Sequence, residues 1–326
     1  MASLKRNSLL AWGLASVAWL ARAQAPPSYP ERAITLVAPT PPGGGTDTIA
    51  RYFAERLSTV LKQPVIVDNR PGANGILGTD NVAHAPKDGY RLLFTYTAAQ
   101  VVNPAIMKKL PYDALKDFTP VAQIGRGGVV LLVSPKLPVK NLAGFIDHAK
   151  ARPNQLNYCS WGNGSGGHLV MEKLKKQAAL AITHVPYKGS AACLQDIMAG
   201  QVEAGYADAG TAVELVRSGK LRALAISTPQ RVYTLPDLPT LDELGYPFGA
   251  YTWYGVFAPA GTPQPVVDKL NGALQTILKD PATVQRMREM NFSDLPLTTP
   301  AQFADTVRQD MALWGEIARS LNLSLD

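Results

Sequence analysis

Short apolar stretches alternate with amphipathic stretches along most of the chain. The first pair is the apolar run ITLVA (34–38) and a helix predicted over 48–61, in which Ile49, Phe53 and Leu57 share one apolar stripe. Strands that alternate with helices in this way form βα units, whose strands lie mostly parallel. The pattern therefore predicts an α/β fold with mostly parallel sheets.

The same alternation continues to the C-terminus, and a chain of 326 residues is long enough for two domains of ordinary size. Further strands are predicted at 64–69, 91–96, 121–135 (in two pieces), 156–161, 182–187, 202–208, 221–227 and 254–259. Further helices are predicted at 79–85, 142–151, 167–178, 190–199, 212–218, 265–279, 281–290 and 300–320.

The first residues have the layout of a secretory signal peptide. Lys5 and Arg6 precede an apolar run over 9–20, and small residues around Ala23 form a cleavage site. The apolar run would make a helix of roughly 18 Å, which is too short for a hydrocarbon core of roughly 30 Å. Cleavage near Ala23 is therefore favoured over a membrane anchor, and 1–23 is interpreted as a signal peptide of an exported, soluble protein.

Charge and cysteine usage limit the partners and the compartment. The formal net charge is +7, but basic and acidic residues are well mixed and no dense basic run occurs. We therefore expect no nucleic-acid partner and a weak preference for anionic ligands. The two cysteines, Cys159 and Cys193, either form one disulfide, which would persist in an exported protein, or stay separate buried thiols.

A glycine loop, PPGGGTDT (41–48), joins the first strand to the first helix. It lacks the lysine of a nucleotide phosphate loop and also lacks G-x-G-x-x-G. The first N–H groups of a helix have no internal partner and carry partial positive charge, and glycine lets a ligand approach them closely. Such a loop suits a small anion such as a carboxylate. Thr46 or Asp47 could alternatively cap the helix, and capping is the preferred interpretation for Asp47.

A second glycine loop, SWGNGSGGHL (160–169), again follows a strand and precedes a helix. Its glycines do form G-x-G-x-x-G, but the next strand ends VPYKG, without the acidic residue that a dinucleotide ribose needs. We therefore reject a dinucleotide and expect no cofactor. Because open parallel sheets bind ligands beyond the carboxyl ends of their strands, two domains with one loop each would form a clamp around an acid.

These residues resemble the Bug family, the solute receptors of tripartite tricarboxylate transporters. The resemblance covers essentially the whole mature chain, through YPERAITLVAPTPPGGGTDTIAR, DNRPGANGILGTDNVAHAPKDGYRLL, YCSWGNGSGGHL, VPYKGSAACLQDIMAGQVEAGYAD, SGKLRALAIS and TWYGVFAPAGTP. It implies a periplasmic binding protein with two doubly wound α/β domains joined by a hinge, in the type II-like "Venus flytrap" arrangement. Domain 1 would comprise 24–124 plus 252–326, and domain 2 would comprise 125–251.

The resemblance also implies a ligand and partners. Family ligands are small organic acids and some amides or amino acids, held largely by backbone N–H groups and ordered water. The expected partners are the membrane components of the transporter, and we expect a monomer. The loops and the resemblance together give these candidate ligand-binding residues: Pro42, Gly43, Gly44, Thr46, Asp47, Tyr96, Thr97, Ser160, Trp161, Gly162, Asn163, Gly164, Ser165, Gly166, His168 and Asp208.

Several of these residues have a second interpretation. Trp161 stands where the family usually has a small residue, and Gly166-Gly167 replaces a more hydroxyl-rich pair. Trp161 either stacks on an aromatic ligand or packs against its own domain, and His168 either contacts the ligand or braces the loop. Asp208 lies where some members meet a ligand's amino group. Arg126, near the expected crossover, is interpreted as a solvated or ion-paired residue rather than a ligand clamp.

A serine hydrolase is the rival hypothesis, with Ser160 or Ser165 as nucleophile beside His168 and Asp208. Neither serine lies in G-x-S-x-G, and the four histidines show no metal-binding spacing, so catalysis is not favoured and no metal is expected. A ligand co-sensor for a signalling partner is compatible with the same fold. The sequence therefore favours a non-enzymatic carboxylate-binding protein.

Overall fold

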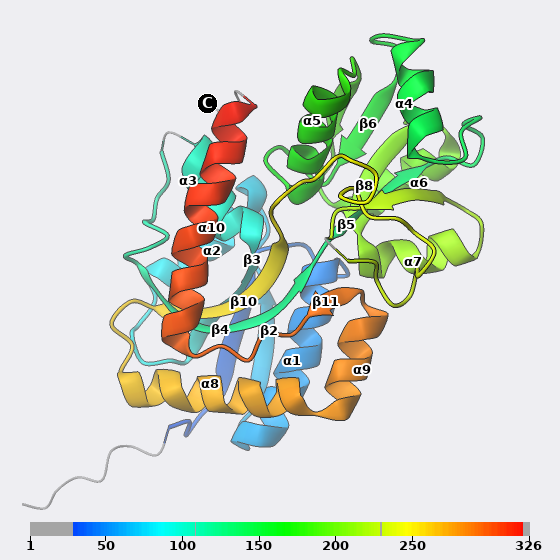
Figure 1. Ribbon diagram of the computed structural model, residues 1–326. Helices are drawn as coiled ribbons and strands as arrows, with labels where there is room; N and C mark the ends of the chain where they lie inside the picture. Colours follow the sequence, from blue (N-terminus) through cyan, green and yellow to red (C-terminus); the bar gives the residue numbers. More distant parts are fainter. Residues whose placement is uncertain (1–28, 108, 229, 322–326) are drawn as a thin grey trace, which may run out of the picture.

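The computed structural model describes residues 29–107, 109–228 and 230–321. The predicted signal peptide lies outside these ranges. Within them, no helix combines the length and the apolar character needed to cross a membrane. Figure 1 shows two α/β lobes, each built around one sheet, which confirms the predicted two-part α/β architecture.

The first lobe contains a six-stranded sheet in the order β11-β4-β10-β3-β1-β2. Its strands are β1 (Ile34–Ala38), β2 (Val65–Asn69), β3 (Arg91–Tyr96), β4 (Phe118–Gly127), β10 (Thr252–Pro259) and β11 (Phe292–Asp294). The second lobe contains a five-stranded sheet in the order β7-β6-β8-β5-β9. Its strands are β5 (Val129–Val133), β6 (Asn157–Ser160), β7 (Thr183–Pro186), β8 (Ala204–Asp208) and β9 (Arg222–Ile226).

Helices cover both faces of each sheet, because alternate residues of the strands are buried on opposite sides. In β1, Leu36 packs in one apolar cluster with α1 (Gly45–Leu61), α8 (Gln264–Lys279) and α9 (Pro281–Glu289), whereas Val37 packs in another. Val37 shares its cluster with α2 (Ile76–Ala83), the π-helix η2 (Ala98–Val102), α3 (Asn103–Ile106) and α10 (Pro300–Ser320). In the second lobe, α4 (Leu142–Lys150) and α5 (Gly166–Ala178) lie opposite α6 (Ser190–Ala199) and α7 (Ala209–Arg217).

The prediction of mostly parallel sheets is wrong. Among the described strands, β1-β2, β1-β3, β6-β7 and β6-β8 pair in parallel, whereas the other five pairings are antiparallel. The antiparallel pairings all involve β4, β5 or β10, which are the strands on either side of a crossing between the sheets. The alternation of strands and helices predicts the parallel βα units, but it carries no signal for strands that enter a sheet from the other lobe.

Two further features were absent from the sequence prediction. The π-helix and α3 occupy 98–106, where no helix is predicted, and the short strand β11 extends the edge of the first sheet. The sequence prediction also began α1 and α2 three residues late, because it did not extend them into the glycine segments.

Two adjacent strands connect the lobes. β4 leaves the first sheet at Gly127 and β5 enters the second at Val129, while β10 returns to the first sheet with Thr252 paired to Gly127. The Trp253 indole N–H donates a hydrogen bond to Asp310 Oδ2 of α10 at 2.6 Å, so the returning strand is fixed to the C-terminal helix. The domain bounds given above remain a prediction.

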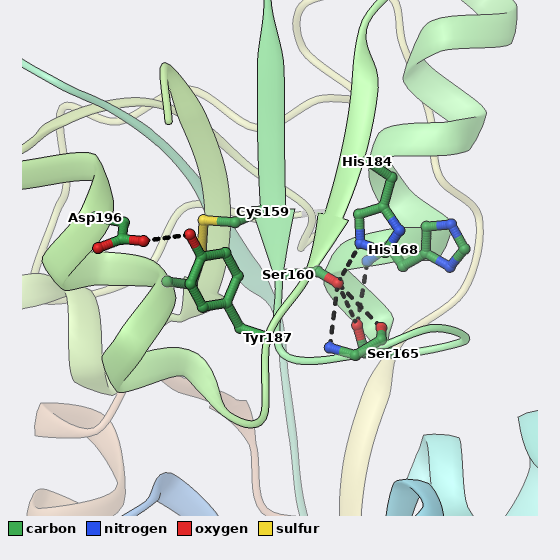
Figure 2. Close-up of a disulfide and its surroundings, with 9 residues drawn as sticks. Cys159, Ser160, Ser165, His168, His184, Tyr187 and Asp196 are labelled. Carbon is green, nitrogen blue, oxygen red and sulfur yellow. Dashed lines mark hydrogen bonds between the residues drawn. A yellow bond between two sulfur atoms is a disulfide. The ribbon is translucent and has the colours of Figure 1, made fainter. Parts of the chain in front are cut away.

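One disulfide joins Cys159, at the end of β6, to Cys193 in α6 (Figure 2). The Cα–Cα distance is 5.7 Å, and both residues are fully buried. The bridge resolves the two alternatives left open by the sequence. It fixes the strand end immediately before Ser160 and therefore the start of the second glycine loop.

Removing this bridge should destabilise the protein mainly by freeing the unfolded chain. The cysteines are 34 residues apart, and closing a loop of that length corresponds to about 3 to 4 kcal/mol of unfolding free energy. Urea unfolding of the Cys159→Ser/Cys193→Ser variant should show a loss of that size. Reductant should destabilise the wild type similarly and leave the variant unchanged. A loss below about 1 kcal/mol would show that the unfolded chain gains little freedom.

Candidate functional site between the lobes

Each lobe repeats one strand arrangement around its glycine loop. The parallel strands run β2-β1-β3 in the first sheet and β7-β6-β8 in the second, so that the first strand of each set lies between the other two. The order of connection reverses at that first strand, and such a switch point opens a crevice beyond the strand ends. The loops after β1 and β6 are therefore equivalent, and so are the ends of β3 and β8.

The first loop is held in shape by the carboxylate of Asp47. This side chain is only 3% exposed, and it accepts hydrogen bonds from the Gly43 N–H at 2.9 Å and from Arg51 and Asn69. Burial opposes ionisation, but these hydrogen bonds outweigh it and lower the pKa of Asp47. The helix N-cap is Gly44, without a side-chain cap, so the prediction that Thr46 or Asp47 caps α1 is wrong.

The hydrogen bonds of Asp47 leave the first amide groups of α1 without a protein acceptor. Across the described residues, the N–H groups of Gly44, Gly45 and Thr46 make no hydrogen bond to protein. Gly43 adopts a φ of +81°, which explains the need for glycine there, and Pro42 and Gly43 are exposed. Thr46 is buried, and the pKa of Tyr254 is raised by burial and by the charge of Asp208.

The second loop is braced by histidine rather than by a carboxylate. The Gly164 N–H donates to His168 Nδ1 at 2.9 Å, and the Ser165 N–H donates to the Gly162 carbonyl at 3.2 Å. Ser165 is the N-cap of α5, and its hydroxyl accepts a hydrogen bond from the His168 N–H. Gly164 and Ser165, predicted to grip the ligand through their amides, thus use those amides inside the loop.

The unpaired amides of α5 belong to the next two residues. Gly166 and Gly167 are buried, and within the described chain their N–H groups have no protein acceptor. Buried amides without a partner are rare, because losing water without a replacement costs free energy. Of the remaining loop residues, Asn163 is exposed, while the backbone of Gly162 has a φ of +137°.

The Trp161 side chain packs on Gly166 and occupies the space in which a side chain at position 167 would lie. A Cβ added at Gly167 would lie 2.8 Å from Cζ3 of the indole, and one at Gly166 would lie 3.6 Å from Cζ2. The half-buried indole therefore packs on its own helix start, and the contact at position 167 leaves no room for a side chain. This geometry supports the interpretation that Trp161 packs against its own domain.

The ends of β3 and β8 place different chemistry in the crevice. Thr97 is buried, and its hydroxyl bonds both the N–H and the carbonyl of Trp253, so it holds two strands together. Tyr96 is half-buried, and burial raises its pKa above the usual value. Asp208 reaches across to the other lobe: a Cβ added at Gly45 would lie 3.3 Å from its Oδ2. No other described side chain donates a hydrogen bond to this carboxylate, and burial raises its pKa to about 6.

A cavity of about 660 Å³ opens from this crevice between α7 and α9. Gly43, Gly45, Asp208, Thr252 and Tyr254 are among the residues that line it, as are Arg217 of α7 and Arg286 of α9. None of the candidate residues of the second loop lines it. Instead, that loop meets the first lobe beside Asn74, which faces Gly162, and Thr252, whose Cγ2 faces Gly166.

The sequence prediction missed several residues that the fold brings to this crevice. Gly45 belongs to the first glycine loop but is not among the predicted ligand-binding residues, although its position faces Asp208 and the Tyr254 hydroxyl. Tyr254, Thr252 and Asn74 come from segments far away in the sequence, and no local pattern marks them. His184 was considered only for metal spacing.

The family model of the tripartite tricarboxylate transporter family receptor matches residues 49–323. The chain belongs to this receptor family. BugT of Bordetella pertussis is 36% identical over 300 residues, covering 91% of this chain and 92% of BugT. Family members are periplasmic solute-binding proteins of the fold described above.

Two solved structures of relatives superpose closely on this receptor. Rpa4515 of R. palustris, determined with adipate, is 34% identical with a TM-score of 0.87, covering 91% of this chain and 99% of that chain. MatC from Rhodopseudomonas palustris, determined with malate, is 33% identical with a TM-score of 0.82, covering 89% and 99%.

The receptor does not assemble the hydrolase site that the sequence offered as an alternative. Ser160 is fully buried, and its hydroxyl lies 2.8 Å from Nε2 of His184, not beside His168. Ser165 is also fully buried, and Asp208 makes no hydrogen bond with either ring. Arg126 pairs with Asp294 at 3.6 Å, which confirms the interpretation of an ion-paired residue.

Asp208→Asn should stabilise the receptor at neutral pH. The folded pKa of about 6 lies above the ordinary value of 3.8, so the charged carboxylate is disfavoured in the folded state and stability falls as pH rises from about 4 through about 6. The substitution should add about 3 kcal/mol to the unfolding free energy at pH 7.5 and much less at pH 4. Urea unfolding at both pH values measures this. Equal stability at pH 7.5 would mean that the carboxylate is solvated in the free protein.

Proposed function

We propose that this receptor captures a small organic acid between its lobes in the periplasm and delivers it to the membrane components of a tripartite tricarboxylate-type transporter. It acts as a monomer and without catalysis, and residues 1–23 are removed during export. The observation that carries this proposal is the set of unpaired amide groups at the starts of α1 and α5.

These amides suit a carboxylate. They begin helices of 17 and 13 residues, whose N-termini carry partial positive charge, and glycine at 44 and 45 leaves the backbone of α1 open to approach. The cavity beside the start of α1 is also lined by Arg217 of α7 and Arg286 of α9, which favour an anion. Partial charges and hydrogen bonds can hold a carboxylate, directly or through ordered water, without a full cation.

The relatives support an aliphatic acid. Adipate and malate, seen with Rpa4515 and MatC, both carry two carboxyl groups on a short aliphatic chain. Stacking of Trp161 on the ligand would favour an aromatic acid, but its indole packs on Gly166 and Gly167 instead. We therefore propose an aliphatic dicarboxylate as the ligand class.

Blocking the start of α1 should abolish binding. At 100 times its Kd, a matching acid adds about 2.7 kcal/mol of stability, so a panel containing adipate and malate should raise the melting temperature by several degrees. Gly45→Val places methyl groups beside Asp208 and the Tyr254 hydroxyl and should remove this shift. Thermal unfolding with and without each acid measures the effect.

Gly272→Val is the matched control, because a Cβ at that position of α8 meets open space. It should keep the full thermal shift, and circular dichroism should show both variants folded. A normal shift in Gly45→Val would place the ligand elsewhere, and no shift of the wild type with any acid would contradict the proposed function.

The lobes should close on the ligand. An acid held by the amides of both α1 and α5 makes all its contacts only when the lobes meet, so binding raises the closed population. β4 and β10 supply the connection about which the lobes can rotate. Small-angle scattering with saturating acid should show a smaller radius of gyration than without it. An unchanged radius at proven saturation would mean that the site is rigid or that the empty receptor is already closed.

A further inference from the structure

The second glycine loop is held by two imidazole rings that lie beside it (Figure 2). His168, in the first turns of α5, accepts the Gly164 N–H at Nδ1, and His184, on β7, contacts the Ser160 hydroxyl through Nε2 at 2.8 Å. The two rings stack with centroids 4.0 Å apart and an interplanar angle of 11°. The loop is therefore bound at two points to one pair of stacked rings.

The hydrogen-bond partners define the protonation state of both rings. A backbone N–H can only donate, so His168 Nδ1 must be unprotonated. The Ser160 hydroxyl has one hydrogen and two lone pairs, and it already accepts from the Gly162 N–H and the Ser165 hydroxyl. Its one hydrogen lies within reach of two acceptors, His184 Nε2 at 2.8 Å and the Gly162 carbonyl at 3.0 Å. We assign it to His184 Nε2, the shorter contact, since a protonated Nε2 would give the oxygen a third donor. Both rings accept a hydrogen bond from the loop.

We propose that His168 and His184 are positioning residues that hold the second loop in its ligand-binding shape as neutral imidazoles, and that protonation of either ring releases the loop and weakens binding of the acid. The effect on acid binding rests on the function proposed above. The effect on the shape of the loop concerns the protein without any ligand.

The surroundings of the rings disfavour a charge. Tyr158 of β6 stacks on His184 with centroids 4.8 Å apart and is fully buried. Glu172 and Lys175 of α5 pair at 2.6 Å nearby, so their charges partly cancel. Burial lowers the pKa of His168 to about 4, with Glu172 opposing and Lys175 adding to the shift. Burial, His168 and Lys175 lower that of His184 to about 3.

The sign of the pH effect follows from these directions. Both folded pKa values lie below the ordinary histidine value of 6.5, so the stabilisation by the neutral rings is complete above that pH. It is lost progressively as the pH falls from about 6.5 toward about 4, because the unfolded or released loop binds protons more readily. A proton on His168 Nδ1 would also place two N–H groups face to face.

Two kinds of variant separate the hydrogen bond from the ring. His168→Asn and His184→Gln keep an acceptor oxygen near the lost nitrogen and cannot titrate. His168→Phe and His184→Phe keep a ring for stacking but have no acceptor. His84→Gln, which changes the exposed histidine at the C-cap of α2, is the matched control.

The first measurement needs no ligand. In labelled full-length mature protein, long-range ¹H–¹⁵N spectra should show His168 Nδ1 and His184 Nε2 unprotonated at pH 7. Amide exchange of residues 160–168, corrected for intrinsic rates and compared with α8, should rise about tenfold in the Phe variants, as expected for one lost hydrogen bond. Wild type should show the same rise as the pH falls from about 6 to about 4, and the Asn/Gln double variant should not.

Adipate is the probe for the binding part. The Phe variants should bind it about tenfold more weakly at pH 7, and the Asn and Gln variants should approach the wild type and His84→Gln. Unchanged exchange in the Phe variants, or a proton on His168 Nδ1 at pH 7, would overturn the loop proposal. If wild type itself fails to bind any dicarboxylate, the proposed function fails, while the exchange data still decide the loop proposal.

Discussion

The site depends on backbone amides that the protein itself leaves without partners. At the start of any helix the first N–H groups lack internal acceptors, and proteins usually satisfy them with a side-chain cap or water. In this receptor a cap exists on α5, through Ser165, but it serves His168 and leaves Gly166 and Gly167 free. On α1 no side-chain cap exists at all. The strand order places each helix start at the switch point of its own sheet.

The two loops reach the same result with opposite chemistry. Asp47 holds the first loop as an anion whose pKa is lowered, so this brace weakens only in strong acid. The histidine pair holds the second loop as neutral rings, and it weakens when the rings gain charge in moderate acid. In both loops the side chains bond the flanking amides and leave the next ones without a protein acceptor. Side-chain identity therefore shapes the loops, although the amides proposed to bind the ligand belong to the backbone.

The sequence predicted much of the fold and located the loops, because both depend on local patterns. Strand–helix alternation gave the βα units, and glycine after a strand marked the two helix starts. The antiparallel crossing strands, the partner of His184 and the approach of Tyr254 to Gly45 depend on residues brought together only by tertiary structure. Local patterns also could not show that the N–H groups of Gly43, Gly164 and Ser165 would be occupied by hydrogen bonds within the loops. Their acceptors are the Asp47 carboxylate, the His168 ring and the Gly162 carbonyl, which only the loop conformation brings into reach.

Asp208 gives the crevice a property that the helix starts alone would not have. Its carboxylate lies against the Gly45 position and receives no hydrogen bond from a described side chain, and burial raises its pKa to about 6. The amide groups attract an acid, whereas an ionised Asp208 repels one unless the ligand or Asp208 itself carries a proton at the contact. We therefore expect the receptor to prefer, among small acids, those that satisfy the amides and place a donor, such as a hydroxyl, an amino or a protonated carboxyl group, against Asp208.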